Sequence, residues 1–364
     1  MKYYLIAGEA SGDLHGSNLM KAILAKDPQA KFRFWGGEKM AKVGGEQVEH
    51  YKNTAFMGFL EVIKNLRTIL SFIKNCKVDI SNWKPDVLIL IDYPGFNMRI
   101  AKYAKKNGFK VVYYISPQVW AWKENRVKKI KQYVDKMLVI LPFEKAFYKN
   151  NWNYEVDFVG HPLLDEISNN DDYTIQLQNN DKPVIALLPG SRVQEINKIL
   201  PEMLKMVIKY PDYHFVLAGL GHLGKDFYKN AIANLPVEIV IDKTYSVLNT
   251  AYAALVASGT ATLEAALFDT PMVVCYKGSA ISYHIGKYLV DIKYISLVNL
   301  ILDKPVIKEL IQNDLNEVEL EKALNTVLNL SNQYLIREEF RKLKQMLGNN
   351  GASERAAEII SKIL

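Results

Sequence analysis

Short apolar runs and segments of helical periodicity alternate along this chain, and the alternation restarts near its middle. The clearest run is Val87–Ile91, which is apolar at every position and follows Pro85-Asp86. Such unbroken runs are typical of strands buried on both faces of a parallel sheet. The other predicted strands are residues 3–7, 32–35, 111–115, 137–141 and 156–159 in the first series, and 184–188, 215–218, 237–241, 253–257 and 272–275 in the second.

Two polar stretches, residues 169–172 and 178–181, separate the two series and are predicted to form a linker. Because strands alternate with helices, each series predicts a doubly wound parallel sheet covered by helices on both faces. We expect an α/β protein of two Rossmann-like domains, residues 1–168 and 181–340, that face a cleft. A helical tail, residues 341–364, is expected to pack back on the first domain or to exchange between subunits, so a homodimer stays open.

Composition limits the setting and the partners of the chain. Its 364 residues carry a net charge of +7, which suits an anionic partner such as phosphate, an acidic membrane or nucleic acid. No recognised nucleic-acid module is present, so nucleic acid is not expected. Cys76 and Cys275 are too few for a disulfide framework, which indicates a reducing compartment. No apolar run approaches the roughly 18 residues of a membrane helix, and we expect a soluble, cytoplasmic protein.

Ligands of such sheets bind beyond the carboxyl ends of the strands, so the polar turns that follow strands are the candidate sites. The turn after residues 253–257 opens a helix with small and hydroxyl-bearing residues, which suits phosphate binding by free backbone N–H groups. A carboxylate one turn later suits the two hydroxyls of a ribose. An ordinary capped helix start explains the same pattern. The residues are Ser258, Gly259, Thr260, Ala261, Thr262 and Glu264.

A second turn of this kind follows residues 184–188. Gly190 permits the turn, Ser191 is a candidate cap, and Arg192 has a side chain that pairs with phosphate. Alone, this pattern also fits a surface arginine beside a cap, but two such turns in one domain favour a diphosphate. Further along, Asn299 lies within an apolar segment and needs a partner, either a nucleotide or a backbone carbonyl.

The turn after the first strand carries titratable groups rather than the glycine spacing of a dinucleotide loop. Glu9, Asp13 and His15 suit acid–base or polar work on a sugar, while an ordinary helix start with Ser11 or Asp13 as its cap explains the same turn. Asp92 follows the most apolar strand, where burial is expected to raise its pKa and make it a usable general base. The alternative for Asp92 is a cap before Pro94.

Two tryptophans precede a basic segment in the first half of the chain. Trp120 and Trp122 beside these lysines and arginine suit a membrane interface or an anionic lipid, although core tryptophans beside a solvated basic face explain the same pattern. Metal binding is not expected, because the histidines are widely spaced and no C-x-x-C occurs. The segment comprises Gln118, Trp120, Trp122, Lys123, Arg126, Lys128 and Lys129.

Taken together, the motifs and their order resemble those of the lipid-A-disaccharide synthase family over most of the chain. The segments that carry the resemblance are residues 8–13, 92–97, 116–122, 160–162, 188–192, 258–264 and 296–299 with 309–312. The resemblance implies a glycosyltransferase-B fold without a metal or other cofactor. It implies inverting transfer of 2,3-diacylglucosamine from its UDP derivative to the 6-hydroxyl of 2,3-diacylglucosamine 1-phosphate (lipid X), at the inner face of the cytoplasmic membrane. The products are a β-1,6-linked disaccharide 1-phosphate and UDP.

The resemblance also implies roles for the residues. The second domain would bind UDP through the turns at Gly190–Arg192 and Ser258–Thr262, through Glu264, and through Asn299 and Gln312. In the first domain, one of Asp92, Glu9 and His15 would be the general base, and the 116–129 segment would meet lipid X or the membrane.

Three positions depart from the family pattern. Glu38 replaces a proline, His15 an aliphatic residue and Lys277 an arginine. Two alternatives remain at this stage. One is a UDP-N-acetylglucosamine 2-epimerase on the same fold, which has no need of the tryptophan and lysine segment. The other is a non-catalytic protein that docks on acidic membranes.

Overall fold

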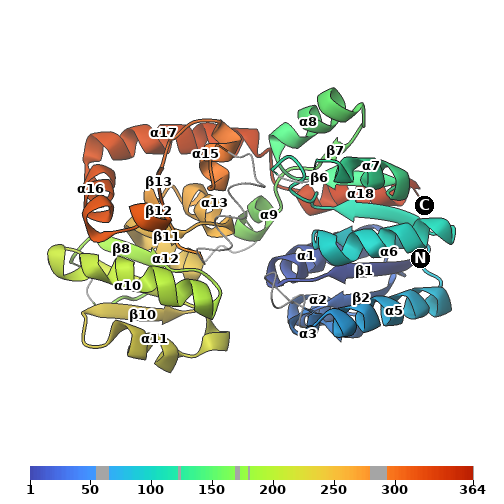
Figure 1. The fold of residues 1–364 in the computed structure, drawn as a ribbon, viewed down its shortest axis with the longest axis horizontal. Coiled ribbons are helices and arrows are strands. Elements are labelled where there is room, and N and C mark those ends of the chain that lie inside the picture. Colours follow the sequence, from blue (N-terminus) through green and yellow to red (C-terminus); the bar gives the residue numbers. More distant parts are fainter. Residues whose placement is uncertain (55–64, 122–123, 169–172, 179–180, 279–292, 364) are drawn as a thin grey trace. The chain divides into compact units, whose positions relative to one another are not determined.

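The computed structural model describes residues 1–54, 65–121, 124–168, 173–178, 181–278 and 293–363, and the chain forms two compact units (Figure 1). Unit 1 comprises Met1–Asn169 together with Leu347–Leu364, and unit 2 comprises Asn170–Met346. Each unit has one parallel sheet with helices packed on it, which confirms the predicted α/β fold class.

Unit 1 contains a seven-stranded parallel sheet in the order β3-β2-β1-β4-β5-β6-β7. The central strands β1 and β4 are buried and pair in register, with Ile6 opposite Leu90. Their near-continuous apolar sequences fit this position, because helices cover both faces of the sheet. The strands are β1 (Lys2–Ala7), β2 (Lys31–Gly36), β3 (Glu46–His50), β4 (Val87–Ile91), β5 (Lys110–Tyr114), β6 (Lys136–Val139) and β7 (Asp157–Phe158).

The helices of unit 1 bury an apolar stripe against this sheet and expose a polar one. In α6, Phe96 and Ile100 enter the core beside Tyr113 of β5. The described helices are α1 (Ala10–Lys26), α2 (Glu38–Val43), α3 (Tyr51–Thr54), α5 (Leu66–Trp83), α6 (Pro94–Lys106), α7 (Arg126–Tyr133), α8 (Pro142–Trp152), α9 (Leu163–Ser168) and α18 (Ala352–Ile363).

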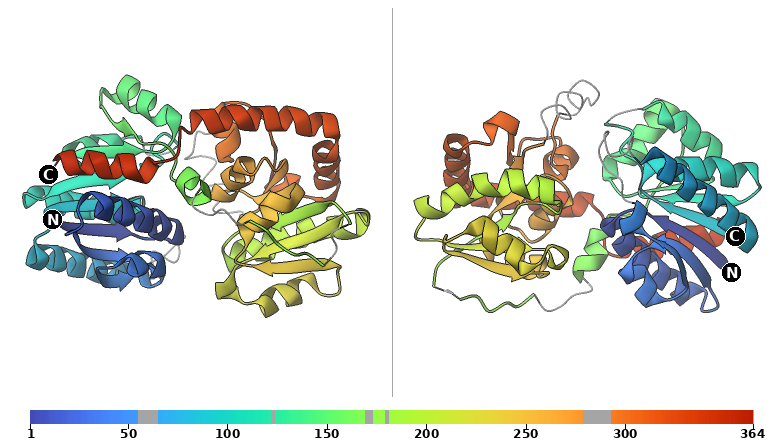
Figure 2. Two further views of the ribbon diagram at one scale, coloured as in Figure 1. Left: turned by 180° about the vertical axis from the view of Figure 1, so that it is seen from behind. Right: turned by 60° about the horizontal axis from the view of Figure 1, so that its bottom comes forward.

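Helix α18 is C-terminal in sequence but belongs to unit 1, where it packs on α1 (Figure 2). Asp165 holds its start, since its carboxylate accepts hydrogen bonds from the N–H groups of Gly351 (2.6 Å), Ala352 (3.1 Å) and Ser353 (2.9 Å). Arg355 adds a hydrogen bond from Nε to the carbonyl of Val159 (2.8 Å). Helix α18 is thus hydrogen-bonded to the segment of unit 1 that follows β7.

Unit 2 contains a six-stranded parallel sheet in the order β10-β9-β8-β11-β12-β13. Its strands are β8 (Val184–Leu188), β9 (His214–Gly219), β10 (Val237–Ile241), β11 (Ala251–Ala257), β12 (Met272–Tyr276) and β13 (Lys308–Ile311). The helices are α10 (Val193–Lys209), α11 (Lys225–Ile232), α12 (Thr244–Thr250), α13 (Thr260–Leu267), α15 (Leu297–Leu302), α16 (Glu317–Leu328) and α17 (Leu330–Met346), and there are 3-10 turns at Gly221–Leu223 and Gln312–Asp314.

Strands β3 and β13 lie at sheet edges and are absent from the predicted set. Both are polar, with Glu46, Gln47 and Glu49 in β3 and Lys308 and Glu309 in β13. These two edge strands are only partly covered and lack the apolar run by which the other strands are found.

Among the described helices, none combines the length and the apolar character needed to cross a membrane.

Candidate functional site

The turn between β8 and α10 leaves Ser191 and Arg192 exposed at the carboxyl edge of the second sheet. Gly190 has φ +112°, a conformation that L residues rarely adopt, and a Cβ there would lie 2.2 Å from Oε2 of Glu195. The N–H of Ser191 donates to the same Oε2 (3.3 Å). Burial raises the pKa of Glu195. The backbone of the turn therefore binds the carboxylate of Glu195, while the side chain of Arg192 is exposed to solvent.

The turn between β11 and α13 lies next along this edge, because β8 and β11 are paired parallel strands. Gly259 (φ +148°) and Thr260 are exposed at the start of α13, where backbone N–H groups favour an anion. Two hydroxyls shape the turn rather than point outward. Ser258 Oγ donates to the carbonyl of Ile295 (3.1 Å), and buried Thr262 Oγ1 donates to that of Gly259 (2.8 Å). Ala261, between them, is half-buried.

Glu264 is half-buried on α13, and its Oε1 accepts a hydrogen bond from Tyr245 Oη on α12 (3.1 Å). Tyr245 packs with Phe268 and Tyr173, with ring centroids 5.0–6.0 Å apart. The carboxylate is thus oriented by a hydroxyl at the rim of an aromatic cluster, a setting suited to accepting hydrogen bonds from a diol.

Asn299 is buried and its amide is fully used by the protein. Nδ2 donates to the carbonyl of Ile307 (2.8 Å) and to Glu309 Oε1 (2.9 Å), and Oδ1 accepts from the N–H of Ile307 (3.0 Å). Glu309 also accepts from the N–H groups of Ile295 (2.9 Å) and Ser296 (3.0 Å). Since Ser258 Oγ donates to Ile295, Asn299 and Glu309 shape the segment that supports the second turn.

Gln312 lies at the end of β13 with φ +55°, and its Oε1 accepts from the N–H of Gly278 (3.1 Å). Lys277, which replaces the family's arginine, forms an ion pair with Glu202 (2.7 Å). Glu202 was absent from the sequence prediction, and Glu309 was included only as part of the 309–312 segment, without a role of its own. An isolated glutamate carries no local pattern that identifies its partners.

In unit 1, Glu9 and Asp92 follow the adjacent strands β1 and β4. Asp92 is half-buried with φ +44°. Burial, and then the negative charge of Glu9, raise the pKa of Asp92 to about 6, while the N–H of Tyr93 opposes the shift. This is the direction that the sequence predicts for a general base. A carboxylate whose proton affinity lies close to neutral pH is suited to accepting a proton in catalysis.

Burial has the opposite effect on His15, which is 5% exposed on α1. It lowers the pKa of His15 to about 4, and it lowers the pKa of the buried His161, of the 160–162 motif, to about 3 with help from His15. His161 Nδ1 accepts from the N–H of Leu163 (3.3 Å). Both imidazoles are neutral at pH 7 and have little affinity for a further proton.

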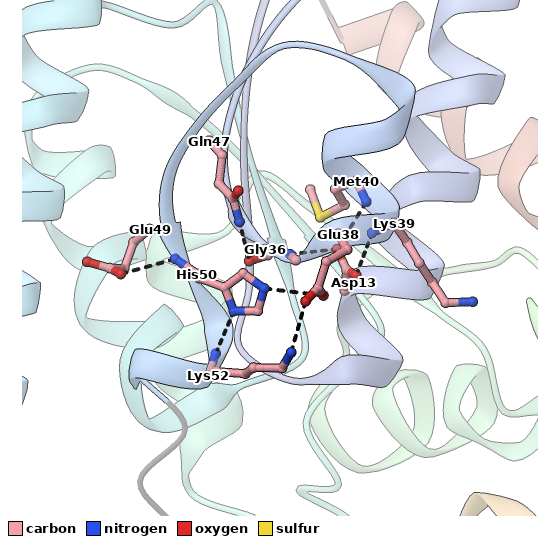
Figure 3. A network of polar contacts seen from close by, with 10 residues as sticks. Asp13, Gly36, Glu38, Lys39, Met40, Gln47, Glu49, His50 and Lys52 are labelled. Carbon is pink, nitrogen blue, oxygen red and sulfur yellow. Dashed lines mark hydrogen bonds and ion pairs between the residues drawn. The ribbon is translucent and has the colours of Figure 1, made fainter. Parts of the chain in front are cut away.

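Asp13 anchors the turn before α2 (Figure 3). It is 2% exposed and accepts from the N–H groups of Gly37 (2.7 Å), Lys39 (3.0 Å) and Met40 (3.1 Å). Its carboxylate therefore caps α2, a role that the sequence analysis did not consider, since the predicted cap was for the helix that begins at the first turn and Asp13 lies within that helix, α1. Ser11, in contrast, is exposed at the start of α1.

Glu38 lies in the same neighbourhood (Figure 3). It pairs with His50 Nε2 (3.2 Å) and Lys52 Nζ (2.9 Å). The glutamate that replaces the family's proline thus has one cationic partner, Lys52, and one imidazole partner, His50, in this chain.

Trp120 is half-buried between β5 and α7, and its Nε1 donates to Glu144 Oε1 (3.3 Å). Glu144 is 1% exposed at the start of α8 and also accepts from the N–H of Leu141 (2.9 Å). Burial raises the pKa of Glu144 to about 7. This carboxyl group therefore holds the indole of Trp120 in the predicted acceptor segment. The sequence analysis did not identify Glu144.

The rest of the acceptor segment is mostly solvent-facing. Gln118, Lys128 and Lys129 are exposed, and Arg126 is half-buried, which lowers its pKa. Lys131, from the same basic run, caps the end of α8 by donating to the carbonyls of Trp152 (2.9 Å) and Asn153 (3.2 Å). Trp122 and Lys123 lie outside the described residues. Within the described ranges, no cluster of three or more metal-ligating side chains occurs.

Two parallel α/β units of this kind define the glycosyltransferase-B class of fold, which sugar-nucleotide transferases and epimerases share. Two solved structures share this fold. The glycotransferase of kitacinnamycin superposes with a TM-score of 0.67 at 12% identity, covering 100% of this chain and 99% of its own. The S. aureus MnaA–UDP structure gives 0.68 at 15% identity, covering 99% and 95%. These likenesses show the fold.

The particular family follows from the sequence matches. The family model described as lipid-A-disaccharide synthetase matches residues 3–364, and the chain belongs to this family. The lipid-A-disaccharide synthase of Syntrophus aciditrophicus is 41% identical over 97% of this chain and 95% of its own length. Lipid-A-disaccharide synthase 1 of Legionella pneumophila is 38% identical over 96% and 94%.

Proposed function

We propose that this chain is a lipid-A-disaccharide synthase that transfers 2,3-diacylglucosamine from its UDP derivative to the 6-hydroxyl of lipid X. The products are the β-1,6-linked disaccharide 1-phosphate and UDP. The observation that carries the proposal is that a single family match spans both the anion-type turns of unit 2 and the carboxylate pair of unit 1.

The donor half of the proposal rests on unit 2. Arg192 and the Gly190–Ser191 turn face the diphosphate, and the start of α13 at Gly259–Ala261 holds a phosphate. Glu264 accepts hydrogen bonds from the ribose. Asn299 and Gln312 act by shaping the segments around these turns, since their side chains hold backbone groups.

The chemical step needs one base, because an α-linked donor gives a β-linked product by a single displacement. Asp92 takes the proton of the acceptor 6-hydroxyl as that oxygen attacks the anomeric carbon. The bond from this carbon to the diphosphate breaks, and UDP leaves with the electron pair. Burial, and then the negative charge of Glu9, keep the proton affinity of Asp92 high. Arg192 and the start of α13 stabilise the charge on the departing diphosphate.

The acceptor half rests on the 116–129 segment of unit 1. Trp120 and the cationic side chains of Arg126, Lys128 and Lys129 receive lipid X, whose phosphate is anionic, or the surface of an acidic membrane. Gln118 and Ser11 are exposed polar groups that suit contacts with the acceptor sugar. Peripheral attachment to the inner face of the cytoplasmic membrane, and a homodimer, belong to the same proposal.

A product assay tests the reaction. Purified protein receives UDP-2,3-diacylglucosamine and lipid X in detergent without added metal, and products are identified by mass spectrometry. A disaccharide 1-phosphate with released UDP is the expected result. Absence of disaccharide with folded protein would overturn the acceptor half, and epimerisation of UDP-N-acetylglucosamine would then be measured, since an epimerase acts on that soluble substrate. Vesicle binding without any turnover would instead identify a non-catalytic binder.

A further inference from the structure

The peptide that carries Asp92 is held in an unfavourable conformation. Asp92 has φ +44° and Tyr93 has φ +48°, so two consecutive non-glycine residues lie in the left-handed region. L residues avoid this region because Cβ approaches the carbonyl oxygen, and such strain persists only where neighbouring groups enforce it. The conformation of Asp92 therefore depends on specific contacts of its backbone.

Two buried side chains supply those contacts. Tyr113 Oη of β5 donates to the carbonyl oxygen of Asp92 at 2.5 Å, and Asn97 Nδ2 of α6 donates to the same oxygen at 2.7 Å. Tyr113 and Asn97 are both 0% exposed. On the other side, the N–H of Asp92 donates to the carbonyl of Tyr114 (3.1 Å). Both lone pairs of the Asp92 carbonyl are thus engaged inside the protein, away from its carboxyl group.

The next residue is fixed as well. The ring of Tyr93 lies against Gly8, where a Cβ would come within 2.3 Å of Tyr93 Cγ. Pro94 then begins α6 with its ring-restricted φ. The turn can therefore relax only at the Asp92 peptide itself, which is the group that Tyr113 and Asn97 hold.

We propose that Tyr113 and Asn97 are positioning residues for Asp92, holding its peptide so that the carboxyl group stays beside Glu9 at the edge of the sheet. This inference rests on the proposed function, in which Asp92 is the base. Neither residue touches the reacting atoms. Without their hydrogen bonds the peptide relaxes towards an extended conformation, and the carboxyl group turns into water.

The charged and titratable groups near Asp92 determine how its pKa changes when the carboxyl group moves. Glu9 comes from the turn after β1, Tyr93 from the same turn as Asp92, and Tyr113 from β5, with Arg126 and Tyr148 facing Tyr113. Burial and Glu9 both raise the pKa of Asp92. A carboxyl group that leaves this setting has a lower pKa and is a weaker base.

The test is Tyr113→Phe, which removes one hydroxyl and keeps the ring. We expect kcat to fall roughly ten-fold, the size of one buried hydrogen bond, with the KM values of donor and acceptor unchanged. We also expect the acid limb of the kcat–pH profile to move to lower pH. Carboxyl NMR titration of Asp92 provides a readout besides activity, and its pKa should fall in Tyr113→Phe.

Tyr114→Phe is the matched control. Tyr114 is the next residue of β5 and is also 0% exposed, but its hydroxyl faces Ser353 without a hydrogen bond of ordinary geometry to any described residue. This variant should keep the wild-type kcat and pH profile. Equal losses in Tyr113→Phe and Tyr114→Phe, without a shift of the acid limb, would overturn the proposal in favour of a merely structural role.

A double variant separates this inference from the proposed function. If Tyr113 acts through Asp92, Asp92→Asn/Tyr113→Phe should have the same residual activity as Asp92→Asn. Asn97→Ala should lower kcat and the pKa of Asp92 in the same direction as Tyr113→Phe. Full activity of Asp92→Asn would refute the base assignment, whereas an inactive Asp92→Asn with a wild-type Tyr113→Phe would refute the positioning role alone.

Discussion

At the scale of single residues, burial distinguishes two of the three candidate bases, Asp92 and His15. It disfavours the charged form of any group, so it raises the pKa of Asp92 to about 6 and lowers that of His15 to about 4. Near neutral pH, Asp92 is ionised yet still binds a proton with useful affinity, while His15 is neutral and a poor acceptor. Of the three candidates that the sequence left open, Asp92 and His15 are therefore chemically unequal.

The first prediction concerns the pH dependence of turnover. The active form of Asp92 is the ionised one, so kcat should rise with pH through about 6 and fall below it. Asp92→Asn should lower kcat by about 100-fold or more and leave UDP affinity unchanged. Steady-state rates from pH 4.5 to 8.5 and calorimetric UDP titrations measure both effects.

His15→Asn provides the control for this profile. It should leave the acid limb near pH 6, because His15 titrates lower. A limb near pH 4 that disappears in His15→Asn, or loss of UDP binding in Asp92→Asn, would contradict the assignment of Asp92 as the base.

The second prediction concerns Glu144, whose pKa is raised by burial from its ordinary 4.5 to about 7. A raised carboxyl pKa means that folding favours the protonated form. Its stabilising contribution is complete below pH 4.5 and is lost as pH rises through about 7. Relative to the wild type, Glu144→Gln should therefore gain about 3 kcal/mol in free energy of unfolding between these limits. Urea denaturation at several pH values checks this, and a constant difference would show that Glu144 stays ionised in the folded protein.

At the scale of elements, the turn between β8 and α10 has the backbone that the sequence predicts. Gly190 was predicted to permit a turn, and its φ of +112° requires glycine. The third prediction is that Gly190→Ala weakens UDP binding by roughly ten-fold, because the turn is strained by about 1–2 kcal/mol and Glu195 is displaced from it. Gly224→Ala is the control, since φ is +78° there but a Cβ meets nothing within 4 Å. Equal loss of UDP affinity in both variants would show that strain in unit 2, rather than this turn, is responsible.

The fourth prediction concerns the attachment of α18. Asp165→Ala leaves three N–H groups at the start of this helix without their acceptor and should lower the stability of unit 1 by about 1–2 kcal/mol. Hydrogen exchange of the α18 amides should become faster. Asn316→Ala removes the cap of α16 in unit 2, where Oδ1 accepts from the N–H of Glu319 (3.1 Å), and should leave α18 unaffected. Unchanged exchange in Asp165→Ala would mean that packing on α1 alone retains the helix.

What the sequence predicts at this scale follows the signals available to it. Buried strands such as Val87–Ile91 are recognised because every residue is apolar. The polar residues that directly follow these strands are then candidate site residues, because ligands bind at the carboxyl ends of parallel strands. The edge strand Lys308–Ile311, the carboxylate of Glu144 and the structural role of Glu309 were not predicted, because their partners lie elsewhere along the chain. Asp13 shows a further limit, since it lies in the first turn of α1 and nothing in the local sequence shows that its carboxylate caps a separate helix, α2.

At the scale of the whole molecule, the net charge is divided unequally. Unit 1 contains 28 Lys and Arg against 19 Asp and Glu, a net charge of +9, whereas unit 2 contains 18 against 20, a net charge of −2. The net positive charge of the chain thus comes entirely from the unit that carries Trp120 and the exposed Lys128 and Lys129. A charge distribution of this kind favours contact of unit 1 with an anionic lipid surface, because each lysine near such a surface contributes about 1 kcal/mol.

The last prediction tests that contact. The full-length protein should bind vesicles that contain phosphatidylglycerol, and its affinity for them should fall as the salt concentration rises. It should not bind vesicles of phosphatidylcholine alone. Lys128→Glu/Lys129→Glu should lower the affinity at least ten-fold, since two attractive charges become repulsive, by about 1 kcal/mol or more each. Lys322→Glu/Lys342→Glu makes the same change of charge at two exposed lysines of unit 2 and should bind like the wild type. If vesicle sedimentation shows equal losses for both double variants, binding follows the total charge of the chain and unit 1 has no special face. If neither variant differs from the wild type, apolar contacts rather than lysines hold the protein at the membrane.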